Sequence, residues 1–273
     1  MSITIAAFVL LAAALHAGWN ALLKSGEDRF WVMTMMGIAT AIACAALLPF
    51  LPIPARASWP YIALSALLHV GYNAFLIRAY RDGEFGSAYP IARGSSPMLV
   101  TLGAALAAGE MPGLQGLVGI VLVSIGIISL AGRRLMDRGI LFALGTGAII
   151  AAYSVTDGIG GRLSGAPVAY TLWMCVWWGV TALPLYRLFG RGGRLWRGPR
   201  ATGLAAAGGI ISVAAYGIVI FAMTRAPMGS VSALRETSVL FAVLLGWLAF
   251  GETLTARRLL SALVIVAGAA CLE

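Results

Sequence analysis

Long apolar stretches, each close to 20 residues, alternate along the whole chain with short polar, glycine-containing or proline-containing breaks. A helix needs roughly 20 predominantly apolar residues to cross the hydrocarbon core of a bilayer. The pattern therefore predicts ten membrane-spanning helices and no soluble domain. Their expected ranges are 3–23, 31–51, 60–79, 87–107, 113–131, 139–157, 168–188, 201–222, 229–250 and 255–272.

Composition agrees with this pattern and excludes most soluble classes of protein. The 273 residues are 60% hydrophobic and only 11% charged, which is too apolar for a soluble surface. The net charge of +9 does not indicate a nucleic-acid partner, because excess arginine collects in the cytoplasmic loops of membrane proteins. The chain has no GxxxxGK[ST] loop for ATP, so any transport is expected to be secondary, with no cofactor.

The basic residues also predict an orientation. Thirteen of them lie in or beside the odd-numbered connections between spans, and three lie in the even-numbered ones. Since positive charge marks the cytoplasmic side of a membrane, the odd connections are expected in the cytoplasm and both termini outside it.

The two halves of the chain carry the same polar residues in the same register. At a shift of 142 positions, Arg93, Ser96, Gly109 and Glu110 match Arg235, Ser238, Gly251 and Glu252. Each half holds five spans, an odd number, so the second half enters the membrane from the opposite side. The sequence predicts an all-α membrane protein of two inverted five-helix repeats, residues 1–132 and 139–273, around a central cavity.

A shorter motif occurs twice within the first half. Spans 1 and 3 each place a histidine, an aromatic residue and an asparagine at i, i+3 and i+4, on one helix face: His16, Trp19 and Asn20, then His69, Tyr72 and Asn73. Spans 6 and 8 echo the aromatic position with Tyr153 and Tyr216. Such a face suits a zwitterionic or aromatic ligand, and hydrogen bonding between helices is the alternative explanation. Two histidines are too few ligands to predict a metal site.

These features resemble the drug/metabolite transporter superfamily, and within it the ten-span EamA-type transporters. The resemblance covers the whole chain, and its best markers are the pairs Gly109–Glu110 and Gly251–Glu252, each followed by a glycine-containing last helix. It implies a basket of ten helices around a central cavity, export of small metabolites, and a place in the bacterial inner membrane. Bacterial amino-acid exporters of the YddG type are the nearest functional analogue.

Three ionisable residues in spans 4 and 9 are candidates for the centre of the site. Arg93 and Arg235 occupy matching positions, and a planar guanidinium can hold a carboxylate or a phosphate. Glu236 follows Arg235 directly, so the two are not expected to share a face of a regular helix, and Glu236 is expected to pair with Arg93 or to take up a proton. A structural ion-pair network between the halves is the alternative. Span 4 is expected to be interrupted at Pro90, Gly94 and Pro97.

Several other residues have two interpretations. Trp173 and Trp177 lie near the middle of span 7, where they either line the cavity or pack between helices. Lys24 falls where a cytoplasmic gate would be, and a solvated loop charge is the simpler explanation. Asp157 closes the predicted span 6 and is expected to be structural, as is Glu110, whose charge suits a helix N-terminus.

The sequence therefore predicts a secondary transporter that exports a small metabolite by alternating access, with aromatic or neutral amino acids as the leading substrates. Sugar phosphates, nucleotides and organic cations are the alternatives, and a channel or an intramembrane enzyme would be the rivals from other classes. A single chain in the lipid bilayer is expected to be the functional unit. The residues expected to bind substrate are Trp19, Asn20, His69, Tyr72, Asn73, Tyr89, Arg93, Tyr153, Trp173, Trp177, Tyr216 and Arg235, and those expected to couple or gate are His16, Lys24 and Glu236.

Overall fold

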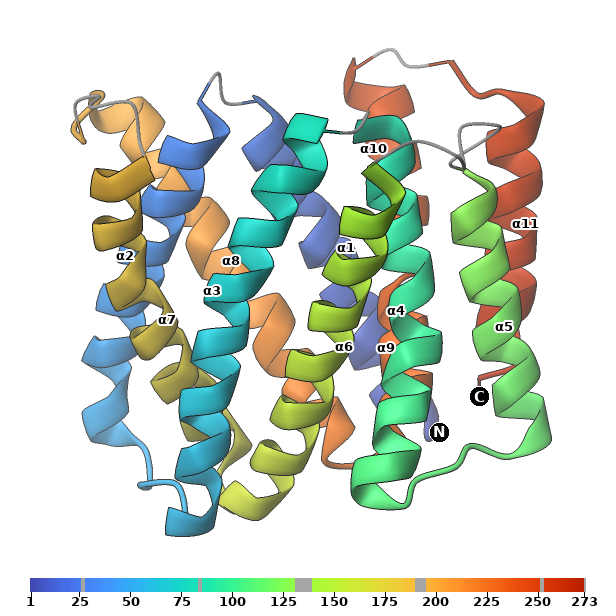
Figure 1. Cartoon of the computed structure of the whole chain (residues 1–273), viewed down its shortest axis with the longest axis horizontal. Coiled ribbons are helices and arrows are strands. Elements are labelled where there is room, and N and C mark those ends of the chain that lie inside the picture. Colours follow the sequence, from blue (N-terminus) through green and yellow to red (C-terminus); the bar gives the residue numbers. More distant parts are fainter. Residues whose placement is uncertain (26–27, 83–84, 131–138, 190–194, 251–252, 273) are drawn as a thin grey trace.

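The computed structural model is a bundle of helices that run up and down side by side (Figure 1). It describes residues 1–25, 28–82, 85–130, 139–189, 195–250 and 253–272, and this part of the chain contains no strand. The helices are α1 Ile3–Ser25, α2 Arg29–Leu47, α3 Trp59–Asp82, α4 Phe85–Ala108, α5 Leu114–Ser129, α6 Gly139–Ser164, α7 Pro167–Phe189, α8 Pro199–Met223, α9 Met228–Arg235, α10 Ser238–Phe250 and α11 Ala256–Ala270, with short 3-10 turns at Leu48–Phe50 and Arg56–Ser58.

Each predicted span is helical over most of its length, and span 9 is divided between the two helices α9 and α10. Seven helical stretches of the described residues are long and apolar enough to cross a membrane. The predicted spans 60–79, 113–131 and 255–272 are the helices α3, α5 and α11, of which α5 has 16 residues and α11 has 15. The chain is therefore a polytopic, all-helical membrane protein.

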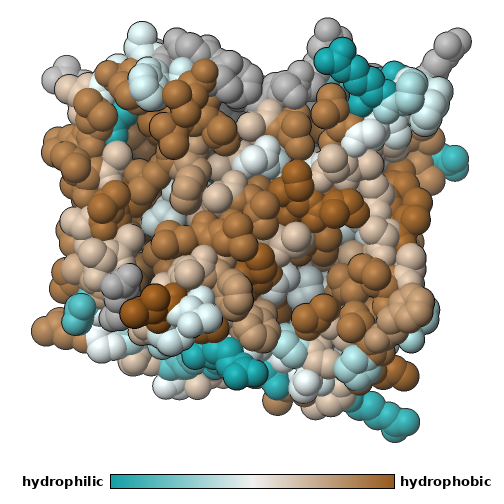
Figure 2. Space-filling view, turned by 180° about the vertical axis from the view of Figure 1, so that it is seen from behind, coloured by the Kyte–Doolittle hydropathy of each residue, from teal (hydrophilic) through white to brown (hydrophobic). Residues whose placement is uncertain are grey.

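The outer surface has the polarity that a bilayer requires. Hydrophobic side chains cover the middle of the face shown in Figure 2, and hydrophilic ones gather toward its two ends. The N-terminus and the C-terminal end lie at the same end of the bundle (Figure 1). Because both ends of the chain lie on one side, the chain crosses the bundle an even number of times, as ten spans would.

The structure differs from the prediction in which of spans 4 and 9 is broken, and both differences affect the centre of the molecule. Span 4 is not interrupted, since α4 runs continuously with Pro90 and Pro97 inside it. Span 9 is interrupted instead, at Glu236 and Thr237, between α9 and α10. There the backbone tightens to i→i−3 hydrogen bonds, and the Thr237 hydroxyl donates to the Leu234 carbonyl at 2.7 Å.

Helix α6 continues seven residues beyond Asp157, the predicted end of span 6. The glycines after Asp157 fill close contacts and do not end the helix. A Cβ atom on Gly158 would lie 2.6 Å from the Met228 sulfur, and one on Gly160 would lie 2.5 Å from the Tyr170 hydroxyl. Asp157 is consequently a fully buried residue inside the bundle and not a residue of the membrane interface.

Glycines bring helix backbones into contact at both edges of the bundle, where α2 packs along α7 and α5 packs along α11 (Figure 1). A Cβ on Gly179 of α7 would lie 2.5 Å from the Gly37 carbonyl of α2. A Cβ on Gly268 of α11 would lie 2.9 Å from the Gly119 carbonyl of α5. Small residues permit such close approach, and dispersion contacts then stabilise helix pairs that gain nothing from the hydrophobic effect in lipid.

The Gly109–Glu110 pair follows the last residue of α4, and its carboxylate caps the first residue of α9. Gly109 has φ +66°, a left-handed conformation that glycine adopts without strain, and the Glu110 N–H bonds back to the Ala104 carbonyl. The Glu110 carboxylate accepts a hydrogen bond from the Met228 N–H at the start of α9 and pairs with Arg162 at 2.6 Å. Glu110 therefore stabilises the N-terminus of α9, whereas the sequence suggested its own following helix.

The start of α2 is tied to the segment before α8 through Asp28. Its carboxylate accepts from the Trp31 N–H at 3.0 Å and pairs with Arg197 at 2.5 Å. Partial burial opposes ionisation, but the Trp31 N–H and the Arg197 guanidinium together hold the pKa of Asp28 below its usual value. The Arg197 guanidinium also lies 4.9 Å from the Trp31 ring, whose N–H donates to the Leu195 carbonyl.

We expect Gly268→Ala to lower stability by about 1–3 kcal/mol, because the new methyl group must push α5 and α11 apart. The unfolding temperature in detergent micelles measures this effect. Gly203→Ala on α8 is the matched control, since its Cβ meets no atom within 4 Å. Equal losses from both changes would contradict the close-packing explanation.

Asp28→Asn is expected to lower the unfolding temperature at neutral pH and to have little effect in acid. A lowered pKa in the folded state means that the stabilisation is complete above the ordinary Asp value of 3.8 and is lost as the pH falls through the folded-state value. Unfolding temperatures of the two proteins measured across this range should converge at the acid end. A difference that does not depend on pH would show that the charge of Asp28 has no part in it.

Candidate functional site

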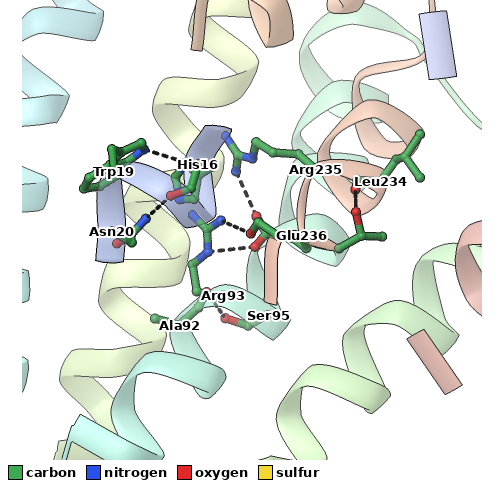
Figure 3. A network of polar contacts seen from close by, with 11 residues as sticks. His16, Trp19, Asn20, Ala92, Arg93, Ser95, Leu234, Arg235 and Glu236 are labelled. Carbon is green, nitrogen blue, oxygen red and sulfur yellow. Dashed lines mark hydrogen bonds and ion pairs between the residues drawn. The ribbon is translucent and has the colours of Figure 1, made fainter. Parts of the chain in front are cut away.

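Two arginines meet one carboxylate in the interior of the bundle (Figure 3). The Nε atom of Arg93, from α4, lies 2.7 Å from one oxygen of Glu236, and a terminal nitrogen of Arg235 lies 3.0 Å from the other. The three side chains are at most 5% exposed. We call these residues the charge triad. It links the two halves of the chain at the break between α9 and α10.

The break explains how sequence neighbours come to share a site. Arg235 is the last residue of α9, and Glu236 follows it in the tightened turn. The prediction that Arg235 and Glu236 point apart is wrong because it assumed a regular helix. The expected contact between Glu236 and Arg93 is present, and a terminal nitrogen of Arg93 also donates to the Ser238 hydroxyl at 3.4 Å.

The charge triad carries one net positive charge, since two guanidinium groups face one carboxylate. An isolated arginine at the centre of a membrane costs at least about 2.5–3.5 kcal/mol, so the shared carboxylate stabilises both. Among the described residues, the Nε of Arg235 has no hydrogen-bond partner. The triad therefore has both the charge and an unused donor with which to attract an anionic group.

The His16 motif of α1 lies beside the charge triad (Figure 3). Within this motif, the Trp19 indole N–H donates to Nδ1 of His16 at 3.3 Å, and the Asn20 amide donates to the His16 carbonyl at 2.7 Å. Both bonds lie within one helix, so the motif does not join helices through them. All three side chains are partly buried.

The His69 motif contributes to an aromatic cluster between α3, α6 and α8. The His69 ring stacks on Tyr153 with centroids 4.2 Å apart, and Tyr216 and Tyr72 meet Tyr153 edge-on at 5.9 and 6.0 Å. We call His69, Tyr72, Tyr153 and Tyr216 the aromatic cluster. The sequence predicted matching aromatic positions in spans 1, 3, 6 and 8. The cluster contains three of them, Tyr72, Tyr153 and Tyr216, and the fourth, Trp19, lies outside it.

Asp157 is a buried residue next to the aromatic cluster, although the sequence predicted only a structural position at the end of span 6. One of its oxygens accepts from the Tyr170 hydroxyl at 2.9 Å, and the other accepts from the Tyr216 hydroxyl at 2.5 Å. Glu236 is therefore not the only deep acid in the chain. The sequence held an indication of this position, because Asp157 follows the Ala152-Tyr153 motif and lies four residues after Tyr153 on the same helix. The predicted end of span 6 nevertheless placed Asp157 at the membrane surface.

The structure does not bring Trp173 and Trp177, the two predicted residues of span 7, to this region. Trp173 packs against Trp59, with ring centroids 5.1 Å apart, and Trp177 is 45% exposed on the outside of the bundle. The neighbouring Trp178 is the one that approaches His69, at 6.3 Å. The side chains of three further predicted residues, Asn73, Tyr89 and Lys24, lie outside the described part of the structure.

The comparison with known families decides what kind of protein this is. The profile of the EamA-like transporter family matches residues 3–132 and again residues 137–272. The chain belongs to the EamA-like transporter family. No curated protein matches it significantly.

A solved structure shares the fold of this EamA-family chain. It is titled "Crystal structure of protein", is 20% identical, and superimposes with a TM-score of 0.76 over 98% of this chain and 94% of its own. At this identity the likeness concerns the fold alone.

Membership of the EamA-like family indicates a transporter of the drug/metabolite superfamily and not an enzyme. Among the described residues of this EamA-family chain, no cluster of three or more His, Cys, Asp or Glu could hold a metal ion.

The charge triad predicts unequal effects for its members. Glu236→Gln leaves two buried guanidinium groups without an anion, so we expect a loss of about 3–5 kcal/mol and little folded protein. Arg93→Gln leaves the Arg235–Glu236 pair intact and neutral, so we expect a folded protein with a much smaller loss. The fraction of monodisperse protein and its unfolding temperature in detergent measure both. Similar results for the two variants would show that charge balance does not govern this site.

Proposed function

We propose that this EamA-family protein is a secondary transporter that exports small metabolites by alternating access, with aromatic or neutral amino acids as the leading substrate class. The observation that carries this proposal is the net positive charge of the charge triad inside the bundle. A membrane protein that needed the triad only for stability would gain more from a neutral pair. An excess cation at this depth is explained by a substrate that brings an anionic group.

The surroundings of the triad suit the rest of an amino acid. The His16 motif lies on one side of it, and the aromatic cluster gathers four rings nearby from three other elements. An aromatic side chain gains about 0.5–1.5 kcal/mol from each well-placed ring contact beyond area burial. The carboxylate of such a substrate would bind Arg93 and Arg235, and its ring would pack on Tyr153 and Tyr216. The resemblance to YddG-type exporters supports the same substrate class.

The arrangement of helices supports two inverted five-helix repeats as the moving parts. If the second half repeats the first, α6 corresponds to α1 and α8 corresponds to α3, so the contact of α1 with α8 is equivalent to the contact of α6 with α3. In the same way, α2 contacts its own counterpart α7, and α5 contacts its own counterpart α11. Repeats of this kind rock about a site near the midplane of the membrane. We place both termini outside the cytoplasm of a bacterial inner membrane, with a single chain as the unit.

Counterflow in liposomes tests this function. Vesicles that hold the purified protein and are loaded with phenylalanine should accumulate labelled phenylalanine from outside, with saturation. Arg93→Gln should reduce this uptake about tenfold or more, because one charge-assisted hydrogen bond contributes about 1.5–3 kcal/mol. Arg56→Gln, at an exposed position outside the helical spans, is the matched control and should leave uptake unchanged.

The outcomes separate the substrate classes. Saturable uptake of aromatic amino acids that depends on Arg93 would support the proposal. Folded protein that exchanges no amino acid would overturn the amino-acid assignment, and sugar phosphates would then be tested, since the same two arginines suit a phosphate. Flux that rises linearly with concentration would instead indicate a channel.

A further inference from the structure

The second buried acid, Asp157, has surroundings unlike those of Glu236. Its partners are the hydroxyls of Tyr170, Tyr216 and Ser65, which are neutral, and none of the ion pairs seen among the described residues includes it. Its side chain is fully buried in α6, within a stretch long and apolar enough to span the membrane. A carboxylate in that position carries an uncompensated charge, and binding a proton removes the charge while keeping hydrogen bonds to both tyrosines.

Asp157 is also attached to the proposed substrate site. Tyr216, which donates to Asp157, has its ring 5.9 Å from Tyr153 and 5.7 Å from His69. Arg93 and Arg235 lie close enough to Tyr153 to act on it electrostatically. The aromatic cluster therefore has both a positive centre and a second buried acid in its surroundings.

We propose, on the basis of the function above, that Asp157 is a proton-binding site whose proton is exchanged for the substrate. A zwitterion with its carboxylate at the charge triad directs its ammonium group toward Tyr216 and Asp157. The positive ammonium favours the ionised carboxylate, so the O–H bond of Asp157 breaks and one proton passes to water. When the substrate leaves on the far side, Asp157 takes one proton from that side and carries it back.

Other groups near Asp157 are less suited to this role. The titratable and charged groups around it are His69 from α3, Tyr170 and Cys175 from α7, Tyr216 from α8 and Tyr153 on its own helix, and Arg93 and Arg235 act electrostatically on Tyr153. The Nδ1 atom of His69 donates to the Ser65 carbonyl at 2.9 Å, and a second proton, on Nε2, would add a positive charge to an interior that already holds two arginines and one carboxylate. Both oxygens of Glu236 are already paired with arginine side chains.

Proton release on substrate binding tests the inference directly. In weakly buffered detergent solution, phenylalanine should release about one proton per bound molecule from the wild-type protein, as linkage requires. Asp157→Asn keeps a polar group for the tyrosines but has no such proton, so binding should continue with less than about one tenth of that release. Asp157→Glu should restore part of it. Asp28→Asn, which removes an acid outside the spans, should release as much as the wild type.

Each result decides between the inference and the proposed function. Substrate that binds wild-type protein without releasing a proton, or an Asp157→Asn variant that releases as much as the wild type, would overturn the proton site and leave the transporter standing. If phenylalanine does not bind, the substrate proposal fails, and the infrared carbonyl band of a protonated acid still tests Asp157. A band that Asp157→Asn abolishes would support the site, and a spectrum unchanged by the substitution would overturn it.

Discussion

An ion inside a membrane must be balanced within the protein, and much of this structure follows from that constraint. Glu236 satisfies two guanidinium groups at once, one from each half of the chain. To do so, the helix must break immediately after Arg235, because adjacent residues of a regular helix point in different directions. The interruption of span 9 is thus a consequence of where the charges lie, while the two prolines of α4 are accommodated within an unbroken helix.

The two deep acids show how environment divides roles between like groups. Glu236 lies between two guanidinium groups, which pair with both of its oxygens. Asp157 accepts hydrogen bonds from the hydroxyls of Tyr170 and Tyr216, which bring no charge. Under the proposed function, the first carboxyl group is suited to permanent pairing and the second to gaining and losing a proton, and both act on Tyr153 of the aromatic cluster.

Helix packing in this protein relies on contact and very little on solvent exclusion. Lipid is as apolar as the side chains it would replace, so helices associate through close fit and polar caps. The contact of Gly119 with Gly268 and that of Gly37 with Gly179 bring backbones together at both edges. The Gly109–Glu110 pair has a related role at the end of α4, where a left-handed glycine turns the chain and the carboxylate caps α9. These two roles give a physical reason for the occurrence of a Gly–Glu pair at this position.

The sequence by itself determined the class of the protein and the approximate positions of its helices, and it identified Arg93, Arg235 and Glu236 as ionisable residues within the spans. These follow from hydrophobic length and from the high energy of charge in lipid, which are local properties of the chain. Only the tertiary structure decided that span 9 is the broken one, that Asp157 is a deep residue, and that Trp177 faces outward. Each of these depends on which partner a residue meets across the bundle. Periodicity within one helix carries no information on such partners, because the same polar residue can lie at an interface, in a core or beside a charge from another helix.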